Sequence, residues 1–508
     1  MPRKREDRAK EKRIRPVKGI NLDGEYVSPV RSYQDLTYEN IKTELVCSRY
    51  TQLLVSLTII GLFLRFYNLG FNSLWLDEAT THHFAKLSFI EIWELTAGGE
   101  YNPPLFHWVE HFMLFFGNSE VILRFIPAFL GILTIPLFYF IGREFLDRNT
   151  GILAAAILTF SPFHIFYSQD ARAYSMMLFF ISLALLFYLV ATRLNETKYW
   201  ILFSIFSAFA FWTHFYSMII IAILIIFAII INARKIKGHV FETKPLLLSI
   251  AAFVLLCLPL IIVTIRLFFI RTSGQPTYGI QGFGIITESI QQFSGYNVYS
   301  AVIFLILLII GFLQIFKTEK IKFFLFTSII ILSFIVSWAL SYKMPMIPRY
   351  LIFLLPIFYI GVAAGFRPFC QALNNRWLIY LLIAVLILIA TPFMSSYYSG
   401  FSKEDWRGFS KNIESMTKEG DFVVVAPGYN TLPLNYYYSN TTDNTVEFDA
   451  NTKNDLEKIS LSKGNSSVFI VITSDIFAAD PGGGTIQYLN EHAKFLGQNT
   501  GINLFKLN

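Results

Sequence analysis

The sequence predicts a polytopic α-helical membrane protein with a small α/β domain at its C-terminal end. Of the 508 residues, 54% are hydrophobic and 15% are charged, whereas about 25% of residues are charged in a soluble protein. Apolar stretches of about 20 residues, the length that crosses a bilayer, recur along the chain. After residue 393 the composition becomes more polar. An ordinary soluble enzyme is therefore excluded.

About eleven candidate membrane-spanning helices follow from this pattern. They are residues 51–69, 121–141, 150–167, 174–192, 199–213, 216–232, 246–265, 299–316, 323–341, 350–366 and 377–393. The 199–232 stretch is divided into two short helices at Thr213-His214-Phe215. Because the number of spans is odd, the two ends of the chain are expected on opposite sides of the membrane.

The N-terminal segment sets the predicted orientation. Residues 1–19 hold nine Lys and Arg against three acidic residues. Such a basic run directly before a membrane span is typical of a cytoplasmic end. We therefore expect a multi-pass protein of the cell membrane, with a basic cytoplasmic segment at 1–50, a transmembrane domain at 51–393 and an extracytoplasmic domain at 394–508. No nucleic-acid partner is expected.

The C-terminal domain is predicted to be small and of mixed α/β type. Its apolar, β-branched runs are typical of buried strands. Ser402-Lys403-Glu404-Asp405 resembles a capping box that opens a helix to about residue 416. The other expected elements are strands at 421–426 and 467–473 and helices at 453–463 and 484–493.

Two adjacent carboxylates, Asp77 and Glu78, lie in the first outer loop, which covers residues 70–120. Acidic side chains beside the hydrocarbon core are costly, so they are functional candidates by default. Within the same loop, apolar and polar residues alternate at helical spacing over 79–97 and 104–116. Helices that lie on a membrane surface show this pattern. The loop is thus expected to be helical.

Other outer segments bring further polar groups to the same membrane face. They are His83, Glu100, Asn102, His107 and His111 in the first loop, Gln169, Asp170 and Arg172 in the second outer turn, and Lys343, Arg349 and Tyr350 in a later segment. Asp170 and Arg172 are two positions apart, so we expect them to pair with other loops. An enzyme that joins a lipid-phosphate donor to a polar acceptor needs such a set. A carboxylate takes the proton of the attacking hydroxyl, and arginines bind the phosphate.

Five motifs occur in order along the first half of the chain. They are Arg65-Phe-Tyr-Asn-Leu-Gly, Leu74-Trp-Leu-Asp-Glu-Ala, Asn102-Pro-Pro-Leu-Phe, Arg124-Phe-Ile-Pro-Ala and Tyr167-Ser-Gln-Asp-Ala-Arg-Ala-Tyr. In these motifs the chain resembles the C-type (GT-C) glycosyltransferases, which use polyprenyl- or dolichyl-phosphate sugars. Specifically, it resembles the broad family around protein O-mannosyltransferases (glycosyltransferase family 39) and aminoarabinose transferases.

The resemblance implies the GT-C fold and an inverting transfer of a hexose or pentose from a lipid-phosphate donor. The acceptor would be an extracytoplasmic protein, glycolipid or cell-surface polymer. Asp77 would be the catalytic base, and Asp170 would assist catalysis or position the acceptor. No cofactor is required. One departure is Glu100-Tyr-Asn-Pro-Pro, which stands where the family often has an acid-x-His-Pro-Pro segment, and Asn102 cannot titrate.

The remaining outer-face residues divide into phosphate, sugar and catalytic candidates. Candidates for the donor phosphate are Arg172, Arg349, Arg65 and Lys343. Candidates for contact with the sugar or the acceptor are Trp75, Glu100, Asn102, Gln169 and Tyr350. Alternatives stay open for several residues. Glu78 is a catalytic candidate, an orienting hydrogen-bond acceptor or a loop charge. The alternative for Arg65, Arg349 and Lys343 is that the side chain extends to the membrane interface, and for Tyr350 it is a place in an interfacial aromatic belt. For Asp170 and Arg172 the alternative is a structural ion pair across the turn.

His107-Trp-Val-Glu110-His111 matches the H-x-x-E-H pattern of one class of zinc proteases. Positions i and i+4 share a helical face, so His107 and His111, with His83 on the same side of the membrane, are candidate ligands for a divalent metal. The alternative is hydrogen-bonded interfacial histidines. Two rival classes follow: a membrane metalloprotease, and a transporter or flippase for a lipid-linked or anionic substrate. A transporter predicts binding groups at the bilayer midplane, whereas these acids lie at the outer rim.

Overall fold

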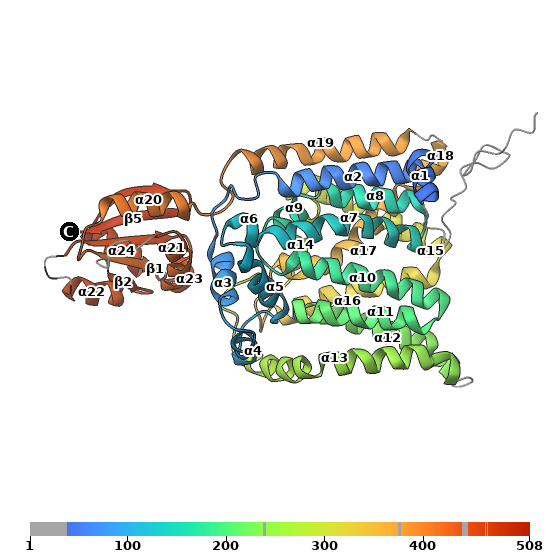
Figure 1. The fold of residues 1–508 in the computed structure, drawn as a ribbon, viewed down its shortest axis with the longest axis horizontal. Helices are drawn as coiled ribbons and strands as arrows, with labels where there is room; N and C mark the ends of the chain where they lie inside the picture. The colour runs from blue at the N-terminus through green and yellow to red at the C-terminus, as the bar shows by residue number, and fades with distance from the viewer. Residues whose placement is uncertain (1–37, 237–239, 374–376, 439–445, 463, 465) are drawn as a thin grey trace, which may run out of the picture.

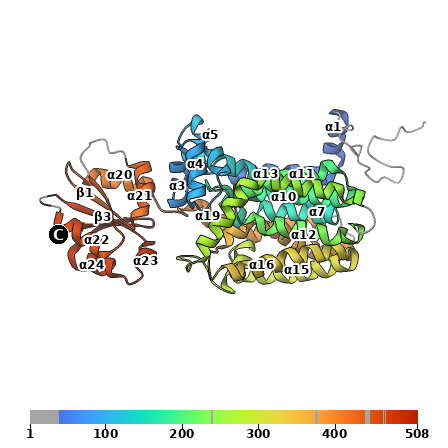
Figure 2. The ribbon, with the colours of Figure 1, turned by 90° about the horizontal axis from the view of Figure 1, so that it is seen from below.

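The computed structural model describes residues 38–236, 240–373, 377–438, 446–462, 464 and 466–508. A bundle of helices runs along the long axis of the molecule, and a small α/β domain sits at one end of it (Figures 1 and 2). We call this end of the bundle the domain end. Most of the expected basic segment at 1–50 lies outside the described residues, which begin near helix α1 (Tyr38–Cys47).

Each stretch expected to span the membrane coincides with one helix or two consecutive helices. They are α2 (Arg49–Phe66), α7 (Phe125–Phe145), α8 (Arg148–Thr159) with α9 (Pro162–Ser168), α10 (Tyr174–Leu194), α11 (Thr197–Thr213), α12 (Ser217–Ile236), α13 (Val240–Thr272), α15 (Val298–Thr318), α16 (Lys320–Leu340), η3 (Pro348–Leu354) with α17 (Leu355–Gly365), and α19 (Leu378–Ser399). In the described ranges, seven helices are long and apolar enough to cross a membrane, or eight if the bent pair is one span. The multi-pass helical architecture is confirmed, and the number eleven stays a prediction.

The bend between α8 and α9 follows from the local sequence. The two helices meet at 61°, and Ser161 and Pro162 stand at the break. Proline lacks the backbone N–H and clashes with the preceding turn, so it begins a helix rather than continuing one. The Ser161 hydroxyl accepts a hydrogen bond from the backbone N–H of His164 and so caps α9. This bend directs the chain into the turn that carries Asp170.

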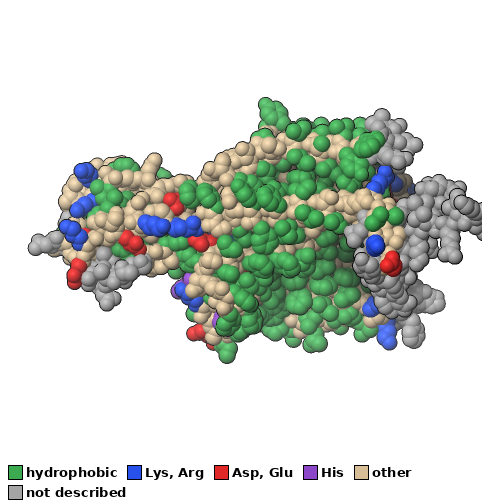
Figure 3. Space-filling model, turned by 45° about the horizontal axis from the view of Figure 1, so that its top comes forward, with side chains coloured by type: hydrophobic (Ala, Val, Ile, Leu, Met, Phe, Trp, Pro, Cys, Tyr) green, Lys and Arg blue, Asp and Glu red, His purple; other side chains and the backbone are tan. Residues whose placement is uncertain are grey.

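The sides of the bundle are covered by apolar side chains, and charged side chains gather at its ends and on the α/β domain (Figure 3). In the most apolar stretch of α19, only 17% is buried within the protein. In the corresponding stretch of the span formed by η3 and α17, 89% is buried. The η3–α17 span is therefore central and α19 peripheral. Apolar side chains on outer helices are what a lipid environment requires, since lipid offers no hydrogen-bond partners.

Short helices lie at the domain end, between the long helices and the α/β domain (Figure 1). They are α3 (Leu76–Ala85), α4 (Phe89–Gly98), α5 (Leu105–Met113), η2 (Leu114–Phe116) and α6 (Glu120–Leu123). A further short helix, α14 (Gly284–Phe293), packs against η3, α15 and α16. The helical content expected at 79–97 and 104–116 is thus confirmed. α4 has a full capping box, because the side chains of Ser88 and Glu91 each bond the other's backbone N–H.

The α/β domain has a five-stranded sheet with helices on both faces. Its strands are β1 (Phe422–Ala426), β2 (Val446–Asp449), β3 (Val468–Thr473), β4 (Ala493–Asn499) and β5 (Ile502–Leu507), in the order β2-β1-β3-β5-β4. β2, β1 and β3 are parallel, and β5 and β4 complete the sheet antiparallel. The helices are α20 (Trp406–Met416), α21 (Thr431–Tyr437), α22 (Lys453–Ser462), α23 (Ile476–Ala479) and α24 (Gly484–His492).

Two details of this domain differ from the sequence prediction. The helix expected to open at Ser402 begins at Trp406 instead, and Asp405 is its cap, because the Asp405 carboxylate accepts the backbone N–H of Gly408. α19 also continues past the expected boundary at 393 to Ser399. The segment between Ser399 and Asp405 is therefore a linker, and its Lys403 is free to reach back into the bundle.

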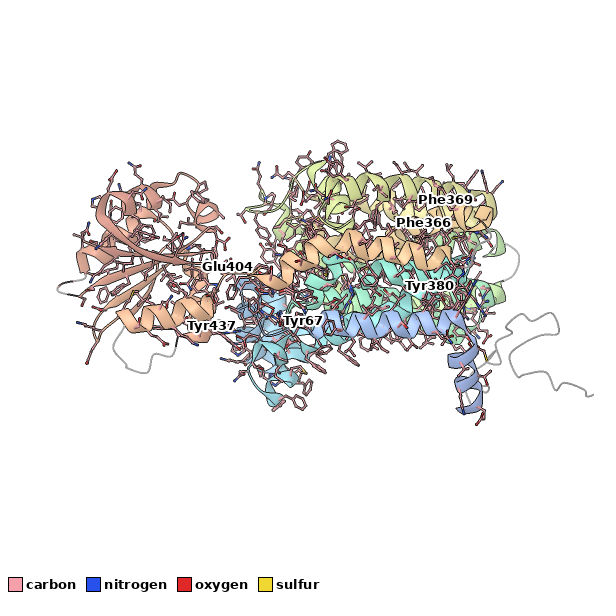
Figure 4. All side chains as sticks on the ribbon, turned by 90° about the horizontal axis from the view of Figure 1, so that it is seen from above. Tyr67, Phe366, Phe369, Tyr380, Glu404 and Tyr437 are labelled. Atoms are coloured by element: carbon pink, nitrogen blue, oxygen red, sulfur yellow. The ribbon has the colours of Figure 1, made fainter. Side chains whose placement is uncertain are left out.

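The α/β domain docks on the short helices through polar contacts. Arg407 donates to the carboxylate of Glu120 at 2.6 Å, and the hydroxyl of Tyr437 donates to the same carboxylate at 2.7 Å. Tyr437 also accepts the backbone N–H of Leu74 at 2.8 Å. Tyr437 and Glu404 lie where the domain meets the bundle, whereas Tyr380 lies towards the opposite end of the bundle (Figure 4). The domain is thus fixed against the loop that carries Asp77.

Close helix packing in the bundle depends on glycines of α15 and α17. A Cβ atom on Gly311 of α15 would overlap the carbonyl oxygen of Gly361 on α17, and one on Gly365 would overlap the carbonyl of Leu307. Small residues let helix backbones approach within a membrane, where van der Waals packing drives association.

Replacing Gly311 by alanine is expected to lower the free energy of unfolding by about 1–3 kcal/mol, because the added methyl group overpacks a backbone contact. Denaturant unfolding of the purified protein in detergent micelles measures this. The matched control is Gly98→Ala in α4, where a Cβ meets no atom within 4 Å. Equal unfolding midpoints for the two variants would contradict the close α15–α17 contact.

Candidate active site

Asp77 and Glu78 stand in the first turn of α3 and point in different directions. Consecutive residues of an α-helix are separated by about 100° around its axis. Asp77 keeps a side chain that is 24% exposed, whereas the side chain of Glu78 is fully buried. One residue therefore faces open space while its neighbour faces the protein interior.

Glu78 is held by a buried arginine. Arg124 donates from Nε and Nη2 to the two carboxylate oxygens of Glu78, both at 2.7 Å. The same guanidinium donates to the backbone carbonyls of Leu69, Asn72 and Ser73 at 2.8–2.9 Å. A bidentate pair of this kind fixes both orientation and distance. The loop before α3 is thereby wrapped around one guanidinium group.

Lys403 joins this network from the linker to the α/β domain. Its ammonium lies 3.0 Å from Glu78 and 2.8 Å from Asp170, and its side chain is only 4% exposed. Asp170 also accepts a hydrogen bond from the indole N–H of Trp75 at 2.9 Å, and Glu78 accepts the backbone N–H of Ala171 at 2.8 Å. The first loop, the turn after α9 and the linker thus meet at two carboxylates.

The two buried acids respond differently to the same surroundings. Burial opposes ionisation of Glu78, but the charges of Arg124 and Lys403 outweigh it and lower the pKa of Glu78 to about 2. Burial raises the pKa of Asp170, and Lys403 offsets this only in part. The contacts with Arg124 and Lys403 therefore favour the charged form of Glu78. This geometry favours the orienting role over the catalytic one among the alternatives open for Glu78.

Asp77 faces two arginines from distant parts of the chain. Arg349 Nη2 lies 3.1 Å from Asp77 Oδ2, and Arg172 Nε lies 3.9 Å from the same oxygen. Arg172 also donates to the backbone carbonyl of Asp77 at 3.1 Å. The guanidinium of Arg349 packs over the rings of Trp75 at 5.2 Å and Tyr174 at 5.6 Å. Asp170 and Arg172 therefore pair with other segments, as expected from their spacing.

A cavity of about 490 Å³ opens in front of Asp77. The sequence candidates that line it are Asp77, Glu100, Asn102, Arg172, Arg349 and Tyr350. The α/β domain closes part of it with Tyr429 and Asp475. A carboxylate, two arginines and several hydroxyl groups thus share one space at the domain end. Trp75 does not line this cavity but contacts two of the residues around it. Its indole N–H donates to Asp170, and its ring packs against the guanidinium of Arg349.

Besides Trp75, three of the candidates for phosphate, sugar or acceptor contact lie outside the cavity lining, and their positions do not support the expected contacts. Arg65 is fully buried, and its guanidinium bonds backbone carbonyls and the Nδ1 atom of His164 at 2.7 Å. The side-chain amide of Gln169 donates to the backbone carbonyls of Arg65, in the last turn of α2, and of Tyr67, and its oxygen accepts the hydroxyl of Tyr397 at 2.7 Å. Lys343 is exposed and does not line the cavity. Both buried side chains hold the end of α2 in place.

The histidine motif lies on α5, behind α3. His107 is buried, and burial lowers its pKa to about 3, with a further contribution from the charge of Arg172. Nδ1 of His111 forms a hydrogen bond of 2.8 Å with the backbone carbonyl of Ala85, and His83 is exposed. Across the described ranges, no group of three or more His, Cys, Asp or Glu side chains is placed to hold a metal ion. A metal at this face rests on the sequence pattern alone.

Comparison with known proteins adds sequence and structural matches. Residues 101–263 match the family of dolichyl-phosphate-mannose-protein mannosyltransferases. A 149-residue part of the chain is 32% identical to a protein of Aquifex aeolicus (strain VF5), an alignment that spans 28% of this chain and 30% of that relative.

Two solved structures share the architecture over most of the chain. ArnT from Cupriavidus metallidurans, bound to undecaprenyl phosphate, superposes with a TM-score of 0.56 at 12% identity and covers 91% of this chain and 98% of its own. The Archaeoglobus fulgidus oligosaccharyltransferase, in complex with Zn and sulfate, gives a TM-score of 0.56 at 14% identity over 89% of this chain and 72% of its own. The chain has the GT-C fold.

Several residues that surround Asp77 and Glu78 were not among the sequence candidates. Arg124 was visible in a family motif, but nothing in its neighbourhood indicated Glu78 as its partner. Lys403 stands in the segment interpreted as a helix cap. Tyr429 and Asp475 follow strands of the α/β domain, and no local signal connects them to Asp77. Only contacts across large sequence separations reveal these residues.

Glu78→Gln is expected to lower the free energy of unfolding by about 3–5 kcal/mol, because it leaves the buried Arg124 without its anionic partner. Thermal or denaturant unfolding of the purified protein measures this. The neighbouring substitution Asp77→Asn is the control. Asp77 is partly exposed, and its two arginines line an open cavity where water can take the place of the carboxylate, so its loss is expected to cost about 1 kcal/mol, the upper value for a solvent-accessible ion pair. Similar losses in both variants would contradict the structural role of Glu78.

Proposed function

We propose that this chain is an inverting glycosyltransferase that moves a monosaccharide from a polyprenyl- or dolichyl-phosphate donor to a hydroxyl acceptor. The observation that carries the proposal is the position of Asp77, which faces a large cavity between Arg172 and Arg349. A base next to two cations is suited to a reaction in which a hydroxyl attacks and a phosphate leaves. The match of residues 101–263 to a mannosyltransferase family supports the same reaction class.

The arginines are placed to receive the donor phosphate. Nη2 of Arg349 donates a hydrogen bond to the carboxylate of Asp77, whereas Nε of Arg349 has no hydrogen-bond partner among the described residues. An unpaired, buried N–H of a guanidinium is costly, and a phosphate oxygen would satisfy it. Undecaprenyl phosphate is bound in the ArnT structure of the same fold, which supports this class of ligand.

The proposed chemistry needs one proton transfer and one displacement. The Asp77 carboxylate takes the proton of the acceptor hydroxyl, and the oxygen attacks the anomeric carbon from the face opposite the phosphate. The new C–O bond forms as the bond from carbon to phosphate oxygen breaks, and its electron pair leaves with the phosphate. Arg172 and Arg349 stabilise the charge that develops there. The anomeric configuration is inverted.

An apolar cavity of about 120 Å³ adjoins the Asp77 cavity and fits the first part of a prenyl chain. Tyr101, Asn102 and Tyr350 line both spaces. The apolar side chains that line the rest of the smaller cavity come from the α12 region, α13 and the α16 region, and polar residues stand among them. The apolar ones are Phe215, Ile219, Phe268, Leu340, Met344 and Pro345, and the others are His214, Tyr216, Thr264 and Arg271. The tail of a donor would thus leave between helices while its phosphate stays with the arginines.

The proposed membrane orientation follows the charge distribution of the sequence. The basic N-terminal segment would be cytoplasmic, and the domain end would lie on the extracytoplasmic side. The acceptor would be a protein, a glycolipid or a cell-surface polymer at that side. Neither rival class gains support from the site. The acids lie at the domain end rather than at mid-helix positions, as a transporter would need, and His107 and His111 do not converge with a third ligand in the described part of the chain.

A panel of polyprenyl-phosphate monosaccharides, both hexoses and pentoses, tests the proposal with purified protein. Mass spectrometry is expected to show release of polyprenyl phosphate together with transferred or hydrolysed sugar for at least one donor. NMR of the product is expected to show the inverted anomer. Absence of turnover for every donor, with candidate peptide and glycolipid acceptors present, would overturn the proposal.

Asp77→Asn is expected to reduce turnover by roughly 100- to 10,000-fold, the range for removal of a general base. Its affinity for undecaprenyl phosphate is expected to stay equal or to rise, because the arginines lose a competing anion. Arg349→Ala is the contrasting variant and is expected to weaken binding of undecaprenyl phosphate by about tenfold, the effect of one charge-assisted hydrogen bond. Full turnover in Asp77→Asn would remove Asp77 from the role of base.

A further inference from the structure

The wall of the Asp77 cavity that lies opposite the helical bundle belongs to the α/β domain. Tyr429, Asp475, Ala478 and Ala479 line this wall. The cavity is thus built from two parts of the chain, although the reacting groups considered so far all come from the bundle. Tyr429 and Asp475 are the polar residues that the α/β domain contributes.

Both residues occupy a characteristic position in the topology of the sheet. Tyr429 follows the carboxyl end of β1, and Asp475 follows the carboxyl end of β3. β1 and β3 are adjacent and parallel, and the chain runs from β1 to β2 on one side before it returns to β3 on the other. Ligands of open α/β sheets bind outside the carboxyl ends of the strands at such a switch point.

The loops at this point are held together by the protein itself. The side-chain amide of Asn430 donates to the hydroxyl of Thr473 at 2.8 Å, and both groups are buried. This bond ties the loop after β1 to the end of β3. The hydroxyl of Tyr429 lies 3.4 Å from the backbone carbonyl of Asp475. The wall is therefore a fixed surface rather than two independent loops.

Charge is distributed unevenly across the cavity. Arg172 and Arg349 stand beside Asp77 on the bundle side. Asp475 forms no ion pair within the described part of the chain. Burial raises the pKa of Asp475, and the charge of Asp77 raises it further, although a hydrogen bond from Asn430 acts in the other direction. A ligand that donates hydrogen bonds to Asp475 would stabilise its charged form.

We propose that Asp475 and Tyr429 form a subsite that binds hydrogen-bond-donating groups of the substrate, namely the hydroxyl or amino groups of a sugar, and disfavours anionic groups. This proposal rests on the proposed function, because the donor phosphate takes the arginine side of the cavity. A carboxylate accepts two hydrogen bonds from neighbouring donors, and the ring of Tyr429 adds an aromatic surface of the kind that ligand pockets use. Asp475 therefore determines specificity without taking part in bond breaking.

Two parts of the substrate carry such groups: the sugar of the donor and the acceptor. Separate kinetic assays distinguish them. Hydrolysis of the donor by water, without an acceptor, reports contacts to the donor sugar alone. Transfer to an acceptor at saturating donor reports contacts to the acceptor.

The experiment compares the purified wild-type protein with Asp475→Asn and with Glu491→Gln, an exposed carboxylate of the same domain on α24. The probes are undecaprenyl phosphate, for binding, and the polyprenyl-phosphate sugars of the panel, including one hexuronate donor, for turnover. In Asp475→Asn we expect KM to rise by about tenfold or more in one of the two assays, as for loss of a hydrogen bond to a charged group. Binding of undecaprenyl phosphate is expected to stay within twofold.

If the subsite binds the donor sugar, Asp475→Asn is expected to discriminate less strongly against the hexuronate donor. If the subsite binds the acceptor, this discrimination is expected to stay unchanged. Glu491→Gln is expected to match the wild type in every assay. Unchanged KM values in both assays for Asp475→Asn would overturn the subsite while leaving the proposed function intact. A parallel loss of undecaprenyl phosphate binding would also overturn it, since that result indicates a structural role. A wild-type protein that processes no donor overturns the proposed function, and the subsite with it.

Discussion

The buried contact of Glu78 with Arg124 and Lys403 is the interaction on which the site depends. It fixes the first turn of α3, and Asp77 owes its position to that turn. Through Lys403 it also fixes Asp170, whose carboxylate holds the indole of Trp75. A buried carboxylate of this kind is tolerated only when it is paired and fully hydrogen-bonded. Glu78 therefore positions the carboxylate of Asp77, the proposed base.

Much of the fold follows from local sequence. Apolar length locates the long helices, because this signal lies within one stretch of the chain. The break at Ser161 and Pro162, inside the span expected at 150–167, was not predicted. Strands β1 and β3 are visible as apolar runs. β4 and β5 are not, since β5 has only three buried residues and β4 has none, and they join the sheet through long-range pairing of β5 with β3 and of β4 with β5. The helix cap assigned to Ser402 was wrong by three residues because Asp405 competes for the same role.

The site was predictable to the extent that each residue carries its own chemical signal. Asp77, Arg172 and Arg349 were identifiable as an acid and two arginines near membrane-span ends, and they do meet. Arg65 gave a similar signal, yet it binds backbone carbonyls, because burial depth cannot be inferred from position along a span. Asp475 gave none. Its place depends on how an entire domain docks, and that docking rests on long-range pairs such as Arg407 with Glu120.

The linker lysine also has a consequence for the order in which the protein matures. Lys403 follows Asp170 by 233 residues, so both buried acids are synthesised long before their second cation. Domains generally fold as they emerge, N-terminal parts first. Until the linker arrives, the nascent bundle holds two acids with Arg124 alone, and water must solvate the charge that Lys403 later neutralises. The network around Glu78 and Asp170 is therefore complete only after the linker has been synthesised, and the α/β domain that closes the cavity follows directly behind it in the chain.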